Sequence, residues 1–300
     1  MAALKALSAG WGRRTVIGLP YMVLILLFTI PFLVVLKISI SESDGIRFAD
    51  LLQYSDGIVR LQFKLSNYLF LFTDDFYVKT YLSSVGYALT NTLICLFIGY
   101  PFAYFMVRSS PSVRPALLML VSLPFWTSFL LRVYAWRGIL DDHGVLNNML
   151  LWLGFIDEPL KMMHTSLSLT IGMVYTYLPF MILPLYSNLV KMDMRLLEAA
   201  KDLGCGPFKA FWLITVPLSK SGIIAGSMLV FIPSVGEYVI PELLGGPNTL
   251  MIGRVLWDEF FSNNDWAMAS AVAVTMVVLI LIPLAVFNHY QASNAARGNR

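Results

Sequence analysis

The sequence predicts an all-α integral membrane protein with six transmembrane helices and both termini in the cytoplasm. Three observations support this fold class. Of the 300 residues, 58% are hydrophobic and only 13% are charged, whereas soluble domains carry about 25% charged residues. Six apolar stretches are long enough, or nearly so, to cross the ~30 Å hydrocarbon core of a bilayer. The basic residues also alternate between successive connections, as the positive-inside rule requires.

The predicted spans are runs of apolar residues, because a spanning helix needs about 20 of them at a rise of ~1.5 Å per residue. In chain order they cover Val16–Leu36, Leu82–Val107, Ala116–Leu131, Thr165–Leu189, Gly222–Ile240 and Ala267–Phe287. The first uncharged run, 15–36, is longer than the ~7–15 apolar residues of a cleaved signal peptide. We therefore expect a retained first helix. The third span is short and is expected to extend past Arg132, whose side chain can snorkel.

Charges in the connections predict the orientation. The tail before the first span contains three basic residues, Lys5, Arg13 and Arg14, and no acidic residue. Basic residues also outnumber acidic ones in the loops after spans two and four and in the last residues of the chain. The outer connection before the sixth span is acidic, with Glu237, Glu242, Asp258, Glu259 and Asp265 against Arg254. Lysine and arginine stay in the cytoplasm, so both termini are expected there.

Two outer connections are long enough to form structure of their own. Residues 38–81 are expected to form a small cap outside the membrane. Within the third outer connection, Val145–Ile156 is apolar but too short to span. It is expected to form a short interfacial helix.

The connection after the fourth span, residues 192–217, carries signals for two ordered helices. Asp193 is a good N-cap for a helix over Met194–Leu203. Gly204 and Gly206 can end that helix, because glycine adopts the left-handed conformation that a C-cap needs.

A second helix is expected to start at Pro207, since proline suits the first helical position, and to end at Pro217. Three aromatic residues are spaced to share one face of it: Phe208, Phe211 and Trp212.

Two short helices at an angle would expose the small residues Ala199 and Ala200 beside Glu198. Such an ordered loop between two membrane spans fits a rigid lever held by another protein. An ordinary surface or re-entrant hairpin fits the same residues, and the residues alone leave both interpretations open.

The spacing of this connection resembles the EAA loop of ATP-binding-cassette importer permeases. The matching residues are Glu198, Ala199, Ala200, Gly204, Ile214 and Pro217. Val216 departs from the pattern, which usually has leucine there. The resemblance implies that the loop is a coupling helix seated in a cleft of a separate ATPase subunit.

No Gly-Lys pair, and so no Gly-x4-Gly-Lys-Ser/Thr phosphate loop, occurs in the chain. ATP and Mg²⁺ are therefore expected in the partner ATPase, with no cofactor in this chain. The two cysteines and three histidines show neither a disulfide framework nor metal-ligand spacing. We expect a non-catalytic subunit without a nucleic-acid partner.

Resemblance extends over nearly the whole chain to permease subunits of putrescine/spermidine importers. The segments that carry it are 18–21, 123–128, 132–136, 144–148, 222–247 and 251–257. This resemblance implies the type I ABC importer permease fold, with a permease domain over 81–288. Residues 1–80 would form the first helix and outer loop, and 289–300 a cytoplasmic tail. It also implies a second homologous permease, two ATPase subunits and a periplasmic polyamine-binding protein.

The charge of Glu237 lies inside the fifth predicted span. Counting ~1.5 Å per residue from Gly222 places it ~22 Å along the helix, in the outer half of the core. A charge there costs on the order of 2–3 kcal/mol unless it faces protein or water. Pro233 can loosen the helix, so an acid facing a cavity would suit a diamine.

Tyr238 and Trp126 could add cation–π contacts to such an ammonium group. Pairing of Glu237 with Arg132 or Arg254, or simple exposure at the surface, remains open.

Three functions remain open from the sequence. The first is the permease subunit of an ATP-driven polyamine importer, which would form a gated path with a second permease. The second is a permease of the same class for another small solute, because the EAA loop does not select cargo. The third is a stand-alone secondary transporter or channel, which predicts ion-coupling charges and internal repeats.

Overall fold

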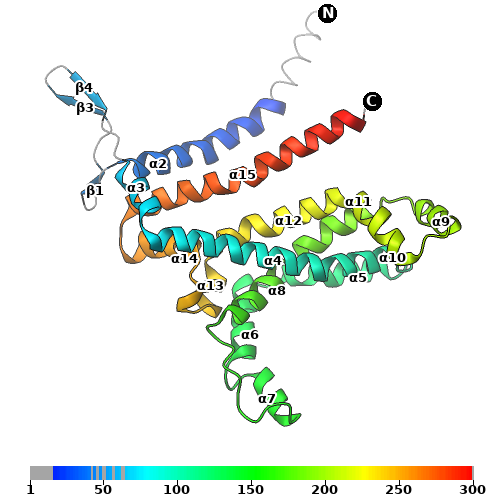
Figure 1. The fold of residues 1–300 in the computed structure, drawn as a ribbon. Coiled ribbons are helices and arrows are strands. Elements are labelled where there is room, and N and C mark those ends of the chain that lie inside the picture. The colour runs from blue at the N-terminus through cyan, green and yellow to red at the C-terminus, as the bar shows by residue number, and fades with distance from the viewer. Residues whose placement is uncertain are drawn as a thin grey trace, which may run out of the picture. The chain divides into compact units, whose positions relative to one another are not determined.

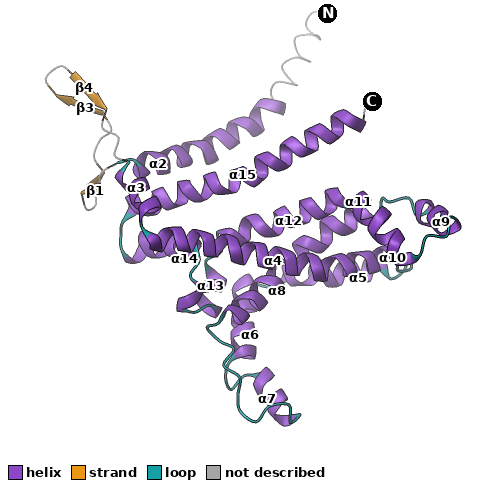
Figure 2. Cartoon of the chain, in the orientation of Figure 1, coloured by secondary structure: helices purple, strands orange, loops and turns teal. Residues whose placement is uncertain are grey.

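A computed structural model describes residues 16–41, 43–44, 47–48, 52–55, 58–61 and 65–298 of the chain (Figure 1). Helices make up most of this part, as Figure 2 shows. Its strands form two antiparallel hairpins in the predicted outer loop, β1 (Ser43–Asp44) with β2 (Arg47–Phe48) and β3 (Leu52–Ser55) with β4 (Ile58–Leu61). The basic residues Lys5, Arg13 and Arg14, which the predicted orientation uses, lie outside the described residues.

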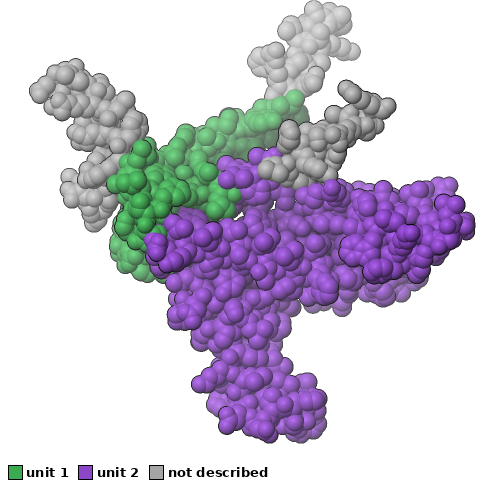
Figure 3. All heavy atoms as spheres, in the orientation of Figure 1, with its two compact units in different colours: residues 1–74, 256–279 green, residues 75–255, 280–300 purple. Residues whose placement is uncertain are grey.

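The chain divides into two compact units (Figure 3). Unit 1 comprises Met1–Asp74 and Leu256–Leu279, and unit 2 comprises Asp75–Val255 and Ile280–Arg300. The division places part of the last helix in unit 1.

Unit 1 begins with a continuous apolar helix over Val16–Ser39. It contains a π-helical turn, η1 (Ile25–Thr29), followed by α2 (Ile30–Ser39) with a proline in its first turn. A π turn shifts the pattern of backbone hydrogen bonds, so the helix can continue past this proline, which has no N–H to donate. Large apolar side chains are exposed along this helix, as suits a helix solvated by lipid. The predicted first helix over Val16–Leu36 is confirmed.

A short helix, α3 (Ser66–Thr73), packs against the end of α2 within unit 1. The buried Ser39 hydroxyl lies 2.7 Å from the Tyr68 hydroxyl, and Asn67 donates to the Ser39 carbonyl over 3.4 Å. Unit 1 also holds η5 (Asp258–Ser262), where the rings of Phe260 and Trp266 stack at 5.7 Å. The long helix α15 (Trp266–Gly298) follows η5 after a short turn and contains the sixth predicted span.

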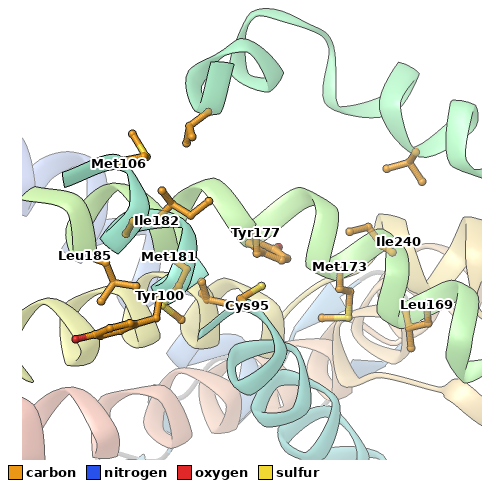
Figure 4. Close-up of a cluster of buried hydrophobic side chains, with 14 of the residues drawn as sticks. Cys95, Tyr100, Met106, Leu169, Met173, Tyr177, Met181, Ile182, Leu185 and Ile240 are labelled. Atoms are coloured by element: carbon orange, nitrogen blue, oxygen red, sulfur yellow. The ribbon is translucent and has the colours of Figure 1, made fainter. Parts of the chain in front are cut away.

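Unit 2 is built on three helices that pack together: α4 (Asp75–Arg108), α8 (Ser166–Leu189) and α12 (Lys220–Val235). Their core is apolar and rich in methionine (Figure 4). Glycines allow the close approach. A Cβ at Gly99 would lie 3.1 Å from the Met181 side chain, and one at Gly226 would lie 3.1 Å from the Met181 backbone oxygen. Small residues at such contacts are typical of membrane helix packing.

Buried polar groups in unit 2 pair across these helices. Asn91 on α4 donates to the Ser234 hydroxyl on α12 over 2.8 Å, and the Tyr100 and Ser219 hydroxyls lie 2.6 Å apart. The Ile252 backbone N–H, on α14 (Ile252–Trp257), donates to the buried Ser84 hydroxyl over 2.7 Å. A membrane interior offers no water, so such groups must find partners within the protein.

The predicted third span, Ala116–Leu131, is wrong as one helix. The chain forms α5 (Arg114–Ser122) and a 3₁₀ turn, η2 (Leu123–Trp126), and then α6 (Phe129–Leu140) after a bend of 92°. Pro124 lacks a backbone N–H, and Thr127 is extended at φ −106° and ψ 150°, so the helix ladder cannot continue.

The fifth predicted span, Gly222–Ile240, is also interrupted. α12 ends at Val235, and a separate short helix, α13 (Val239–Leu244), follows. A 3₁₀ turn, η4 (Pro247–Thr249), then leads to α14. The described residues contain four helices long and apolar enough to cross a membrane. They also contain two bent helix pairs, Arg114–Trp126 with Phe129–Trp152 and Pro207–Leu218 with Lys220–Val235.

The predicted interfacial helix is present but shorter than Val145–Ile156, because α7 (Val145–Trp152) ends just before Gly154, whose φ is +71°. The buried Asn147 side chain on α7 links the chain segments before and after this helix. It donates to the Asp141 carbonyl over 3.2 Å and to the Leu160 carbonyl over 2.9 Å, and it accepts from the Leu160 N–H over 2.9 Å.

Candidate functional site

The ordered loop predicted over residues 192–217 lies at one end of the α4–α8–α12 bundle of unit 2 (Figure 1). It consists of α9 (Arg195–Asp202), α10 (Pro207–Ala210), a π turn, η3 (Phe211–Thr215), and α11 (Val216–Leu218). The prediction of two short helices separated by glycines is confirmed in outline.

The start of the loop follows the predicted cap with a shift of one residue. α9 starts at Arg195, so Met194 occupies the geometric N-cap. Asp193 still serves the helix terminus, because its Oδ1 accepts from the Arg195 backbone N–H over 3.0 Å and from the Arg195 Nε over 3.2 Å.

Gly204 ends α9 in the left-handed conformation, with φ +80°. The Gly204 N–H donates to the Lys201 carbonyl over 2.8 Å, and the Cys205 N–H donates to the Ala200 carbonyl over 2.9 Å. Gly206 then caps α10 with extended backbone, and Pro207 stands in its first turn. These three positions confirm the predicted helix end and helix start.

Pro217 does not end the second helix, contrary to the prediction. The helix passes it and ends at Leu218, and the chain bends by 67° between Pro207–Leu218 and the following α12. The π turn η3 shifts the hydrogen bonding before the proline, since the Val216 N–H bonds to the Phe211 carbonyl. The wider turn relieves the clash between the proline ring and the preceding turn.

The three aromatic residues of the second helix are not equivalent. Phe211 turns toward α4 and makes edge-to-face contacts with Tyr100 and Tyr104, at centroid distances of 5.5 and 5.6 Å. Phe208 and Trp212 are exposed and contact each other at 6.3 Å. Phe211 therefore fixes the loop to the bundle, while the other two rings face outward.

The residues that match the EAA spacing divide by exposure. Glu198, Ala199 and Pro217 are exposed, and Ile214 is half-buried. Ala200 is buried at 9% relative exposure, so the expectation that both alanines are exposed is wrong for Ala200. It lies on the face of α9 that turns inward, one residue after Ala199.

The interruption between α12 and α13 is organised by Glu237. Its Oε1 accepts from the Val239 and Ile240 backbone N–H groups over 3.1 and 3.4 Å, at the start of α13. Its Oε2 accepts a hydrogen bond from the hydroxyl of Tyr177 on α8. A half-buried carboxylate thus satisfies the donors that a broken helix leaves free.

The arginine partners considered for Glu237 are wrong. Arg254 pairs with Glu242 at 2.8 Å, and the Arg132 guanidinium lies over the Phe129 ring at 5.9 Å. The actual partner, Tyr177, was missed by sequence reasoning, because a tyrosine in an apolar span carries no local sign of which acid it meets.

The other residues predicted for a substrate path lie on three different elements. Tyr238 follows Glu237 at the N-cap of α13 and is half-buried. Pro233 lies in the last turn of α12, and the helix breaks at Gly236 rather than at the proline. Trp126 ends η2 with 84% of its surface exposed.

Gly253 is a second residue that sequence reasoning missed at this break. A Cβ there would lie 2.4 Å from the Gly236 carbonyl oxygen and 2.6 Å from that of Glu237. The backbone of α14 therefore packs directly against the interruption.

Among the described residues, no three His, Cys, Asp or Glu side chains gather as a metal site would require.

Several helices long and apolar enough to cross a bilayer, with an ordered loop between two of the spans, indicate a multi-pass membrane protein. The chain belongs to the family described as "binding-protein-dependent transport system inner membrane component", whose model matches residues 6–293. The chain is thus a membrane permease, and the resemblance of its sequence to ABC importer permeases is confirmed.

Similar proteins support this assignment. The chain is 40% identical over 281 residues to the "spermidine/putrescine transport system permease protein PotB" of Haemophilus influenzae, covering 94% of each chain. It is 40% identical over 264 residues to the PotB of Escherichia coli K12, covering 88% of this chain and 92% of that protein.

Solved structures show the same fold. A bacterial ABC transporter that imports the acidic polysaccharide alginate matches with a TM-score of 0.66 at 17% identity, covering 98% of this chain and 99% of that chain. The alginate transporter in complex with a pentasaccharide-bound periplasmic protein matches with a TM-score of 0.65 at 18% identity, covering 95% of each chain. These likenesses concern the fold alone.

Proposed function

We propose that this chain is a permease subunit of an ATP-driven polyamine importer, with putrescine or spermidine as its cargo. The observation that carries the proposal is the 40% identity, over 94% of both chains, to a permease named for spermidine and putrescine. An importer of another small solute is the alternative, because the alginate transporter has a similar fold. A stand-alone secondary transporter is less favoured, since the family is named for dependence on a binding protein.

The proposed topology has six crossings with both termini in the cytoplasm of a bacterial cell. Each of the four helices that are long and apolar enough to cross a membrane would cross once. The bent α5–α6 segment and the interrupted α12–α13 segment supply the other two crossings. Broken helices are tolerated at membrane depth where they are buried in protein or line a cavity. Residues 81–288 would form the permease domain, after a first helix and outer loop over 1–80 and before a tail over 289–300.

The loop 192–217 is proposed to couple transport to two ATPase subunits, which bind ATP and Mg²⁺. Support comes from the exposed Glu198 and Ala199 and from the left-handed Gly204, which fixes the angle between α9 and α10. Phe211 ties the loop to α4, so a movement of α9 would be transmitted to the bundle. A second homologous permease would complete the path, a periplasmic polyamine-binding protein would deliver the cargo, and no nucleic acid takes part.

Glu237 is proposed as a contact of the cargo on this path, together with Tyr238, Trp126 and Pro233. Its carboxylate now accepts three hydrogen bonds, two from backbone N–H groups and one from Tyr177. A passing ammonium group could replace the Tyr177 hydroxyl and leave the helix cap intact. A small movement between α8 and α13 would then open or close the site.

Uptake by the reconstituted importer tests which solute is the cargo. The chain is assembled with its partner permease, ATPase and binding protein in liposomes, and ATP-dependent accumulation of radiolabelled putrescine, spermidine and a neutral amino acid is measured. The proposal expects the polyamines alone to accumulate. Accumulation of the amino acid without the polyamines would refute the cargo, and uptake without the ATPase would refute the class.

Glu237→Gln tests the path. The amide keeps one oxygen for the α13 cap but removes the negative charge, so putrescine uptake is expected to fall while the complex still assembles. Glu242→Gln is the comparison variant, because it removes the charge of a nearby acid that lies on α13 and pairs with Arg254 rather than with Tyr177. Unchanged uptake by Glu237→Gln would exclude the path role.

A further inference from the structure

Two cavities of unit 2 lie next to each other along α4 and share Phe211 in their walls. The first has a volume of about 310 Å³ and lies between the end of α4, the start of α5 and the loop helices α9 and α10. The second, about 420 Å³, runs along α4 beside η3 and α12. Both volumes fall in the range of small-molecule sites.

The first cavity is basic. Three cationic side chains line it, Arg108, Arg114 and Lys201, against one acid, Glu198. Arg114 donates to the Val107 and Ser109 carbonyls over 2.7 and 3.0 Å, and Arg108 donates to the Tyr104 hydroxyl over 3.0 Å. Among the described residues, none of these three cations forms an ion pair with a carboxylate. The cavity therefore keeps a positive balance that suits an anion.

The second cavity is apolar. It is lined by side chains of α4, η3 and α12, among them Leu93, Phe97, Trp212 and Ile223. Leu93 and Phe97 are exposed on the bundle surface. A groove of this composition along a spanning helix suits a hydrocarbon chain and offers nothing to a charged group.

The order of the cavities along α4 matches the depth profile of a bilayer. α4 has 34 residues, or about 51 Å at ~1.5 Å per residue, which exceeds the ~30 Å hydrocarbon core. The helix is thus long enough to project beyond the core, and we place its last residue, Arg108, at headgroup level. Leu93 lies 15 positions earlier, about 22 Å deeper along the helix.

We propose that the two cavities together bind one anionic phospholipid, with its phosphate in the basic cavity and one acyl chain in the apolar groove, on either side of Phe211. Basic pockets beside membrane helices bind lipid headgroups by the same chemistry. Because Glu198 and Lys201 belong to α9, the lipid would contact the ordered loop and the bundle at once. The inference concerns lipid binding by this chain and does not rest on the cargo or on the ATPase.

Native mass spectrometry of the full chain in detergent tests the site. The protein is titrated with phosphatidylglycerol and, separately, with phosphatidylcholine of the same acyl chains. One phosphatidylglycerol is expected to bind more tightly than the zwitterionic lipid. Equal affinity for both lipids, or many weak copies with no first tight one, would overturn the proposal.

Charge variants locate the headgroup. A Lys or Arg near a membrane surface contributes about 1 kcal/mol to binding of an anionic lipid, so Arg108→Gln and Lys201→Gln are each expected to weaken phosphatidylglycerol binding roughly fivefold. Lys209→Gln is the matched control, because Lys209 is exposed on α10 and does not line the cavity. Equal effects of all three variants would overturn the headgroup assignment.

A second pair of variants locates the acyl chain. Leu93→Trp fills the groove, whereas Leu89→Trp adds the same bulk to an exposed position one turn away that does not line it. Only the first is expected to weaken lipid binding. If both variants bind lipid like the wild type, the groove does not hold the acyl chain.

If Arg108 is needed for ATPase binding while no lipid is retained, the basic cavity belongs to that partner instead.

Discussion

The loop between α9 and α10 and the interruption between α12 and α13 both break a helix, but they do so by different means. At the loop, the backbone turns through left-handed Gly204, and the following helix starts at Pro207. At the interruption, Gly236 has an ordinary φ of −94°, and the ends are held by the carboxylate of Glu237 and by Tyr177 from another helix.

The difference follows from the surroundings. An exposed turn needs only backbone conformations that its residues adopt at low cost, because water can satisfy the remaining polar groups. A break inside a bundle must satisfy its free N–H groups with protein atoms. Local sequence therefore specifies the first, and tertiary contacts hold the second.

The largest effect is expected from Glu198→Lys, which tests the loop as a docking surface. Reversal of a charge that meets a complementary partner costs several kcal/mol. ATPase binding should weaken by at least about tenfold and ATP-driven uptake should be lost, measured by co-purification and uptake. Asp202→Lys makes the same charge change near the end of α9 and should couple normally. A fully coupled Glu198→Lys complex would refute the docking role.

Gly253→Ala should have the next largest effect, because its Cβ would meet two backbone oxygens that cannot move independently. We expect a loss of about 3 kcal/mol, the upper end for overpacking, read as a lower midpoint of thermal unfolding in detergent. Gly86→Ala, on α4 with no atom within 4 Å of its Cβ, should be neutral or stabilising. Similar midpoints for the two variants would show that the break tolerates movement.

A double-mutant cycle of Tyr177→Phe and Glu237→Gln measures the hydrogen bond that joins α8 to the break. Hydrogen bonds to charged groups contribute about 1.5–3 kcal/mol, so each single variant should lower the free energy of unfolding. The double variant should lose less than the sum of the two. Strict additivity would mean that the bond contributes nothing to the folded state.

The smallest effect is expected from Gly204→Ala. An L-residue in the left-handed region costs about 1–2 kcal/mol, and the penalty stays local because a Cβ at Gly204 meets no atom within 4 Å. Gly206→Ala is the control, since its φ of −65° suits any residue and its Cβ also meets open space. An equal change of unfolding midpoint in both variants would contradict the conformational explanation.

Much of the loop could be predicted from sequence. The helix over 194–203, the role of Gly204 and the start at Pro207 agree with the structure to within one residue. The errors at the loop have a common origin. The passage of the helix through Pro217 depends on the π turn, and the burial of Ala200 depends on how α9 packs, neither of which the local residues specify.

The membrane segments show the same limit. Hydropathy located apolar runs that match the described helices, but it did not reveal that Ala116–Leu131 bends by 92° or that Gly222–Ile240 divides at Gly236. Apolar composition reports solvation by lipid, which is the same for a straight and a broken span. Continuity depends on where the freed backbone groups find partners.

The sequence by itself determined that this is a membrane protein, where its apolar runs lie and how its exposed loop turns, because these follow from composition, periodicity and the backbone preferences of glycine and proline. The permease class was indicated by the resemblance of the loop residues to a known family. Only the tertiary structure decided that Glu237 meets Tyr177, that Gly253 packs against the break and that a basic cavity and an apolar groove meet at Phe211. Those contacts join residues far apart in the chain, and their pairing depends on which helix faces pack together.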